Sequence, residues 1–215
     1  PARASTRPRA PRLTTCARVA TAQRANRPPG RRRANLRYNL EYGLPLVTPA
    51  LTSLWRRALS RAAEDTDPDY PPAEGLLLLR SAIAGYLGRR RGLMVDAEDV
   101  IVTAGVQQAI DLVARALVAP GDGAAIEDPH YQGTRQVLMA AAARMHFVPV
   151  DGDGLEVTML PASRVRLACV TPSHQFPRGV VLSLRRRLEL LAWAGHADAW
   201  IVEDDYDGES RHDGR

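Results

Sequence analysis

Between Asp99 and Asp205 the sequence alternates short apolar segments, typical of strands, with longer amphipathic segments, typical of helices. Strands are expected at 99–105, 123–129, 145–150, 164–172 and 199–205, and helices at 106–122, 131–144 and 183–197. Two earlier helices are expected at 48–64 and 76–92, and Gly92 ends the second. Strand–helix alternation with apolar strands predicts an α/β fold, in which helices cover both faces of a mostly parallel sheet.

Positive charge is concentrated at the start of the chain. Residues 1–37 hold 11 arginines and no acid, whereas residues 38–215 hold 18 arginines and 24 acids. All 29 basic residues are arginine, and the chain contains no lysine. We predict that residues 1–36 are a flexible basic linker or tail, with weak contact to nucleic acid or a transit peptide as alternatives.

Composition excludes several classes of protein. The 215 residues suffice for one good-sized core, and no run of about eighteen apolar residues is present that would span a membrane. Cys16 and Cys169 do not suggest a disulfide framework or a metal site. We therefore expect a protein of the reducing cytoplasm, with no membrane contact and no bound metal.

Four loops follow expected strands, at the edge of the sheet where folds of this class bind ligands. They are 103–105, 128–131, 171–179 and 204–207. In the first loop, Gly105 permits a ligand to approach the backbone closely. The start of the following helix attracts a phosphate, and Gln107 can donate a further hydrogen bond to it. In the second loop, Tyr131 can stack on a flat ring. In the third, His174 can act as a general base or a hydrogen-bond donor.

The last loop carries a cluster of acids. Asp204 follows the apolar run Trp200–Val202, so it lies where the buried part of the expected strand ends. A carboxylate at that position requires a cationic partner. Tyr206 shares its face of the strand. Each candidate also has an ordinary explanation, such as a plain helix start, a core tyrosine, a structural histidine or solvated acids. Taken together, a phosphate cradle, a stacking ring and a carboxylate that keeps a ring nitrogen protonated describe pyridoxal 5′-phosphate.

From Leu36 onward the chain resembles the aminotransferase class I/II fold, fold type I of the pyridoxal-phosphate enzymes. More narrowly, it is similar to the aminotransferase-like domain of MocR-type regulators, a branch of the GntR transcription factors. The residues that carry the resemblance are YNLEYGLP, YPPAEGLLLLRSAIAGYLGRRRGL, VIVTAGVQQAIDLVARALVAPGD, EDPHYQG, TPSHQFPRG and VEDDYDGE. The resemblance implies a three-layer large domain, of which residues 37–215 are the amino-terminal, incomplete part.

The resemblance also implies roles for individual residues. Gly105, Val106 and Gln107 are expected to hold the cofactor phosphate, and Tyr131 to stack on the ring. The carboxylate of Asp204 is expected to pair with the ring nitrogen, and Tyr206 to contact the ring hydroxyl. In a homodimer, Tyr70 is expected to reach the phosphate of the partner's cofactor.

Departures from the family pattern limit what this chain is expected to do. Phe176-Pro177-Arg178-Gly179 replaces the usual Asn-Pro-Thr-Gly, and Phe176 cannot make the hydrogen bond of that Asn. The form His-Gln-Phe-Pro is typical of the MocR branch, so His174 is counted with the cofactor-binding residues. The family's Schiff-base lysine is absent, so no catalytic residue is assigned, and this polypeptide alone is not expected to transaminate.

Three hypotheses stay open. The first is part of a MocR/GntR-type regulator that senses pyridoxal phosphate or its amino-acid adduct and contacts DNA through a winged-helix domain outside this sequence. The second is a truncated class I/II aminotransferase. The third is an inactive remnant of either.

Overall fold

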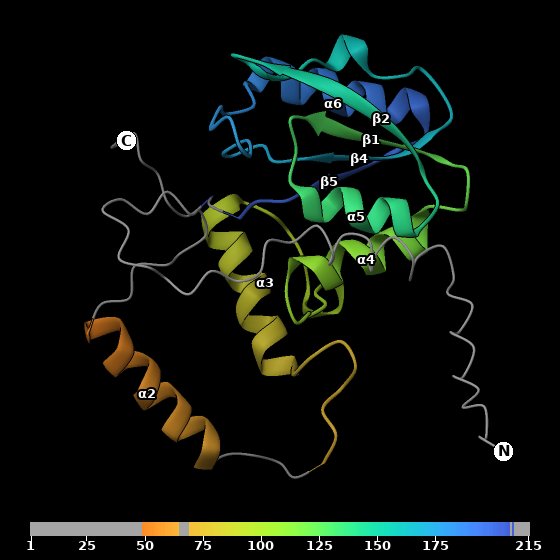
Figure 1. Ribbon diagram of the computed structural model, residues 1–215. Helices are drawn as coiled ribbons and strands as arrows, with labels where there is room; N and C mark the ends of the chain where they lie inside the picture. Colours follow the sequence, from red (N-terminus) through yellow and green to blue (C-terminus); the bar gives the residue numbers. More distant parts are fainter. Residues whose placement is uncertain (1–48, 65–68, 207, 209–215) are drawn as a thin grey trace, which may run out of the picture. The chain divides into compact units, whose positions relative to one another are not determined.

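The computed structural model describes residues 49–64, 69–206 and 208 (Figure 1). The basic segment 1–36 and the motif Tyr38–Pro45 therefore lie outside the described residues. The chain is divided into two compact units between Val102 and Thr103. The second unit contains the sheet.

The first unit contains two of the predicted helices, α2 (Pro49–Glu64) and α3 (Leu77–Arg91). As predicted, α3 ends at Gly92, which adopts the left-handed conformation at φ +67°. A buried arginine, Arg80, donates from Nε to the carbonyl of Gly75 at 3.0 Å and from Nη1 to the carbonyl of Ala97 at 2.8 Å. It thereby joins the loop before α3 to the short 3₁₀ helix η1 (Ala97–Asp99).

The predicted strand at 99–105 is wrong. Its first residue belongs to η1, and residues 100–103 have no strand partner in the described part of the chain. The N–H of Val100 donates to the carbonyl of Ala97 at 3.2 Å, and the N–H of Val102 donates to the carbonyl of Glu74 at 2.8 Å. The Val-Ile-Val pattern favours a strand, but a strand also requires a neighbour to complete its hydrogen bonds, and no local pattern reveals that neighbour.

The second unit is built on a five-stranded sheet in the order β3-β2-β1-β4-β5. The strands are β1 (Gly123–Asp128), β2 (Arg144–Asp151), β3 (Gly154–Leu155), β4 (Val165–Val170) and β5 (Trp200–Glu203). All neighbouring pairs are parallel except β2 and β3, which are antiparallel. The four longer strands confirm the predicted ones, and the mostly parallel sheet confirms the predicted α/β class.

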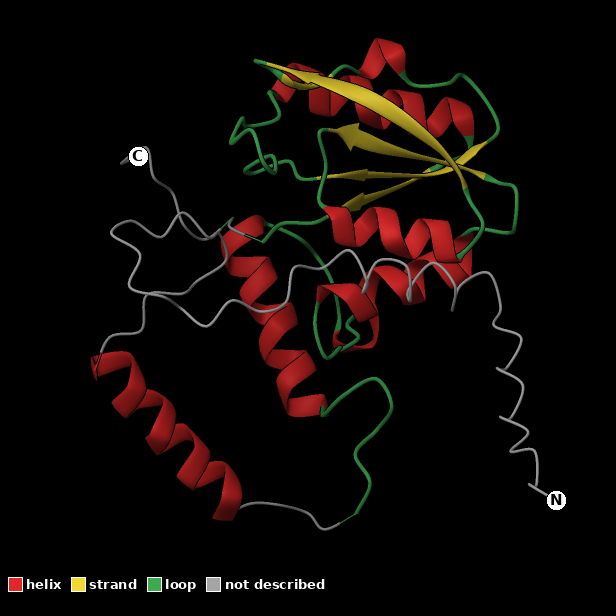
Figure 2. Ribbon diagram, in the orientation of Figure 1, coloured by secondary structure: helices red, strands yellow, loops and turns green. Residues whose placement is uncertain are grey.

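Helices pack on both faces of this sheet, as predicted (Figure 2). On one face lie α4 (Val106–Leu117) and α5 (Gln132–Ala140), and on the other lies α6 (Leu184–Ala197). Side chains alternate along each strand between the two cores. In β1, Ala124 and Ile126 pack toward α4 and α5, whereas Ala125 packs with Leu190 of α6.

The described residues contain neither a membrane-spanning helix nor a cluster of metal-binding side chains. None of the described helices is long and apolar enough to cross a membrane. No cluster of three or more His, Cys, Asp or Glu side chains that could hold a metal ion occurs among them either.

Candidate functional site

A small hollow, partly open to solvent, lies where β1, β4 and β5 end and α5 begins. Its lining comes from four segments: Ile126 and Glu127, then His130, Tyr131 and Thr134, then Cys169, Val170 and Thr171, and finally Asp204. The parallel strands run in the same direction, so their carboxyl ends and the loops that follow meet at one edge of the sheet. The structure thus brings two of the predicted residues, Tyr131 and Asp204, into one hollow.

Asp204 enters the hollow from the end of β5. Strand alternation places it on the same face as Val202, which packs in the core beneath α4 and α5. Its backbone N–H donates to the carbonyl of Val170 at 2.9 Å and so extends the pairing of β4 with β5 by one residue. Burial raises the pKa of the Asp204 carboxyl above its ordinary value, and the charge of Asp205 raises it further. A cation bound in the hollow would offset this cost of keeping Asp204 ionised.

A second carboxylate, that of Glu127, lines the hollow from the end of β1. It is buried and accepts hydrogen bonds from the N–H of Thr171 at 3.2 Å, from the hydroxyl of Thr171 at 2.6 Å and from the amide of Gln175 at 3.0 Å. Burial raises the pKa of Glu127; the hydrogen bonds from Thr171 and Gln175 oppose that rise, and the charge of Asp204 adds to it. These donors compensate for much of the cost of burying the group.

The start of α4 presents free backbone donors. The first hydrogen bonds of this helix run from the N–H groups of Gln108 and Ala109 to the carbonyl of Gly105. Within the described chain, the N–H groups of Val106 and Gln107 have no acceptor. Gly105 precedes them at φ +146° and ψ 174°, a conformation that is essentially restricted to glycine. Exposed amides at a helix start suit an anion.

This helix start lies next to the residues of the hollow. A side-chain carbon added at Gly133 would collide with the amide of Gln107 and with the ring of Tyr131. The three residues are therefore packed closely together. Gly133 allows the side-chain amide of Gln107 to approach Tyr131, so this predicted phosphate donor and the predicted stacking ring are neighbours.

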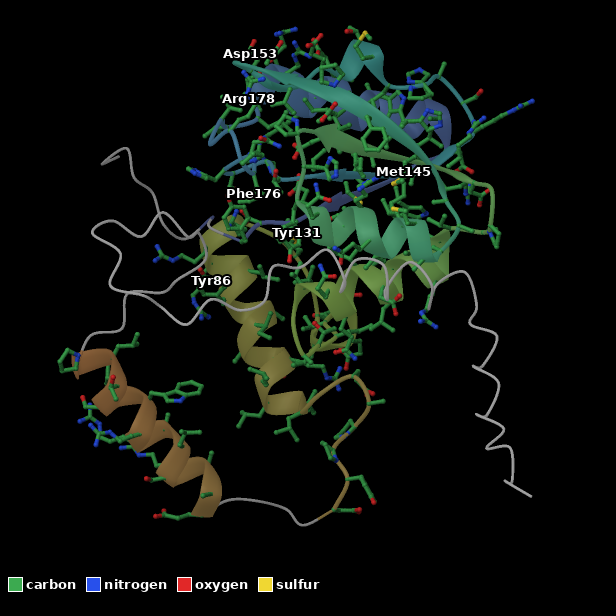
Figure 3. The ribbon with its side chains drawn as sticks, viewed as in Figure 1. Tyr86, Tyr131, Met145, Asp153, Phe176 and Arg178 are labelled. Atoms are coloured by element: carbon green, nitrogen blue, oxygen red, sulfur yellow. The ribbon has the colours of Figure 1, made fainter. Side chains whose placement is uncertain are left out.

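Two ring contacts order the loops around the hollow. Tyr131 meets Phe176 edge to face, with ring centroids 6.0 Å apart and planes at 89°; both residues are labelled in Figure 3. His174 meets Tyr206 in the same way at 6.3 Å, and the hydroxyl of Tyr206 donates to the backbone carbonyl of His174 at 2.8 Å. The predicted residues His174 and Tyr206 are thus brought together with each other.

The structure gives a role to Arg178, to which sequence reasoning assigned none. Its guanidinium donates to the backbone carbonyl of Val150 near the end of β2, and its N–H donates to the side-chain oxygen of Gln175 at 3.1 Å. Arg178 therefore ties its loop to a strand on the far side of β1. Tyr70 belongs to the first unit and its side chain is 95% exposed, so its predicted contact with a cofactor stays a prediction.

Sequence reasoning missed several residues that line the hollow or support it: Glu127, His130, Thr134, Cys169, Thr171 and Gln175. Glu127 ends the apolar run Gly123–Ile126 in the same way that Asp204 ends its own, and this signal could have identified it. Cys169 is free and buried, and burial raises the pKa of its thiol to about 12, so it is an inert part of the wall.

The sequence matches the family described as aminotransferase class I and II over residues 41–206. Two curated relatives are regulators. The HTH-type pyridoxine biosynthesis transcriptional regulator PdxR of Corynebacterium glutamicum is 39% identical over 82% of this chain and 38% of its own length. The probable rhizopine catabolism regulatory protein MocR of Rhizobium meliloti is 40% identical over 80% of this chain and 36% of its own. The chain thus spans less than two fifths of either relative.

Solved structures show the same fold. An archaeal alanine:glyoxylate aminotransferase superposes on 70% of this chain and 40% of its own, with a TM-score of 0.65 and 32% identity. This similarity supports the fold type I architecture that the sequence predicted.

Proposed function

The chain belongs to the aminotransferase class I and II family, and from this premise we propose that it binds pyridoxal 5′-phosphate as the ligand-sensing domain of a MocR-type regulator. One observation carries the proposal. A stacking tyrosine, Tyr131, and a half-buried carboxylate, Asp204, line one hollow, and the side-chain amide of Gln107, from the start of α4, lies beside Tyr131.

The residues present fit this cofactor. The amides of Val106 and Gln107, which Gly105 exposes, would hold the phosphate, since a helix start offers donors and a favourable dipole. Tyr131 would stack on the ring. The carboxylate of Asp204, whose pKa burial raises, would gain a cationic partner in the protonated ring nitrogen. When bound, the cofactor supplies an electron-poor ring and an aldehyde that reacts with amino groups.

The remaining predicted residues orient these groups. Tyr206 would contact the ring hydroxyl through its own hydroxyl, which donates to the carbonyl of His174. Phe176 offers no polar side-chain atom where aminotransferases usually have Asn; it packs on Tyr131 instead. Because Phe176 cannot make the hydrogen bond of that Asn, and His-Gln-Phe-Pro is typical of the MocR branch, this replacement favours sensing over amino transfer.

Further parts of the proposal concern a longer protein. Residues 37–215 would form the amino-terminal part of the cofactor domain, joined through the basic segment 1–36 to a winged-helix domain that contacts DNA. Such a regulator would act in the cytoplasm as a homodimer, with Tyr70 reaching the partner's cofactor. The similarity to PdxR and MocR, both named as regulators, supports this assignment.

The test is a titration of the 215-residue chain with pyridoxal phosphate, followed by circular dichroism in the absorption band of the cofactor. We expect saturable, reversible binding that inorganic phosphate weakens by competition. Since the chain has no lysine, treatment with borohydride and mass spectrometry should find no cofactor attached to a side chain. Absence of binding would contradict the proposed function, and a stable adduct would contradict the assignment of purely non-covalent contacts.

The second candidate, an aminotransferase, is supported by the likeness to the archaeal alanine:glyoxylate aminotransferase. Sequencing the source gene beyond both ends of this chain discriminates the two. A reading frame for a winged helix before position 1 would favour the regulator. Its absence, together with a lysine-containing segment after Arg215, would favour the enzyme.

A further inference from the structure

The side chain of Gln175 connects the two loops that flank the hollow. It is 1% exposed, and its Nε2 lies 3.0 Å from Oε2 of Glu127, 2.8 Å from the carbonyl of Pro129 and 2.7 Å from the carbonyl of Phe176. Its Oε1 accepts a hydrogen bond from the N–H of Arg178 at 3.1 Å. One buried amide therefore joins the loop after β1, which carries Tyr131, to the loop after β4, which carries His174 and Phe176.

Glu127 is the central acceptor of this hydrogen-bond network. It is 4% exposed at the end of the central strand β1, and two of its three donors belong to Thr171 at the end of β4. The hydroxyl of Thr171 also accepts from the N–H of Phe176 at 3.2 Å. A buried carboxylate destabilises the fold unless donors surround it, so the loss of Gln175 would leave Glu127 short of one donor and loosen both loops.

The network determines where the stacking ring lies. Tyr131 packs edge to face on Phe176, and Phe176 is held through its N–H by Thr171 and through its carbonyl by Gln175. Asp204 lines the same hollow from the end of β5, which pairs directly with β4. The separation of Tyr131 from Asp204 therefore depends on the bonds that Gln175 and Glu127 make.

We propose that Gln175 and Glu127 are a positioning pair that sets Tyr131 against Asp204 and so fixes the orientation of a pyridoxal phosphate ring in the hollow. This inference rests on the proposed function and deepens it. Gln175 is buried and its side-chain amide is engaged with Glu127, with two loop carbonyls and with the N–H of Arg178, so it acts through the loops and not by contact with the ring.

Gln175→Met in the 215-residue chain tests the pair, because methionine matches glutamine in shape and lacks its donors and acceptor. Two quantities are measured: the affinity for pyridoxal phosphate and the induced circular dichroism per molecule of bound cofactor. We expect affinity to fall about tenfold, which corresponds to the loss of one or two hydrogen bonds, and the induced signal at saturation to fall with it. Gln136→Met on α5, away from the hollow, is the matched control and should change neither quantity.

The outcomes separate this inference from the proposed function. A wild-type chain that binds no pyridoxal phosphate would overturn both. If the wild-type chain binds and Gln175→Met keeps the full dichroic signal per bound cofactor, the inference alone is wrong, even if the melting temperature falls. Should Gln175→Met fail to fold, Thr171→Val removes the 2.6 Å bond to Glu127 and leaves Gln175 in place. It should reduce the signal in the same direction, and an unchanged signal would overturn the positioning role.

Discussion

The hydroxyl of Tyr206 donates a hydrogen bond to the backbone carbonyl of His174 at 2.8 Å. This bond links the segment after β5 to the loop after β4, two neighbouring strands of the sheet. The loop therefore has a tether from each side, because Gln175 holds it to the end of β1.

Tyr206→Phe should consequently destabilise the chain even without a cofactor. A hydrogen bond of this kind contributes about 0.5–1.5 kcal/mol, and we expect the low end of that range because the side chain of Tyr206 is exposed. Urea denaturation of the variant beside the wild-type chain measures the difference. An unchanged denaturation midpoint would mean that the bond to His174 contributes nothing in solution.

Gly105→Ala should impair the start of α4. Its φ of +146° lies where a side chain strains the backbone, at a cost of about 1–3 kcal/mol. The chain would either lose that stability or turn the peptide away, and in both cases the amides of Val106 and Gln107 would be misdirected. We expect weaker competition by inorganic phosphate against pyridoxal phosphate.

Gly152→Ala is the matched control for this change. A side-chain carbon at Gly152 meets nothing within 4 Å, so the variant should behave like the wild-type chain. If Gly105→Ala and Gly152→Ala bind phosphate equally well, the helix start is not the phosphate site.

The sequence predicted those parts of the fold that local patterns determine. The apolar runs of β1, β2, β4 and β5 and the glycine that ends α3 are such patterns, and all are confirmed. Strand β3 was missed because it has only two residues, Gly154 and Leu155, and exists only by folding back on β2. The pairing, and not the composition, makes it a strand.

The site likewise contains some residues that local sequence patterns predict and others that only the folded structure reveals. Asp204 and Tyr131 could be predicted, since each follows an apolar strand and such strand ends converge at one edge of a parallel sheet. Gln175 could not be, because a glutamine between His and Phe in a loop reads as a solvated side chain. Its burial arises only when the loops after β1 and β4 close over Glu127. Glu127 and Gln175 are about fifty residues apart in the sequence.

Leu190→Ala and Leu188→Ala test the packing of α6 on the sheet. Leu190 is 2% exposed in the core that includes Ala125 and Val170, whereas Leu188 is 59% exposed on the same helix. The first change should lower the free energy of unfolding by about 2–5 kcal/mol, and the second by no more than about 0.5 kcal/mol. Equal losses in urea denaturation would contradict the position of α6 on the sheet.

Asp204→Asn should show the opposing demands of stability and ligand binding. Burial raises the pKa of Asp204 above the ordinary 3.8, so the folded chain binds this proton more tightly than the unfolded chain. Stability from this group is therefore fully present below the ordinary pKa and is lost as pH rises through the raised pKa of the folded state. At pH 7 the cofactor-free variant should resist urea better than the wild-type chain, and the difference should disappear below about pH 4.

With pyridoxal phosphate bound, the wild-type chain should instead be more stable than Asp204→Asn. The neutral amide cannot supply the negative charge that a protonated ring nitrogen requires, and a charged hydrogen bond contributes about 1.5–3 kcal/mol, so affinity should fall by about 10- to 100-fold. Glu203→Gln, an exposed acid on the other face of β5, is the control and should leave both the pH profile and the affinity unchanged. If Asp204→Asn binds the cofactor as tightly as the wild-type chain, Asp204 is not the partner of the ring nitrogen, whatever the urea curves show.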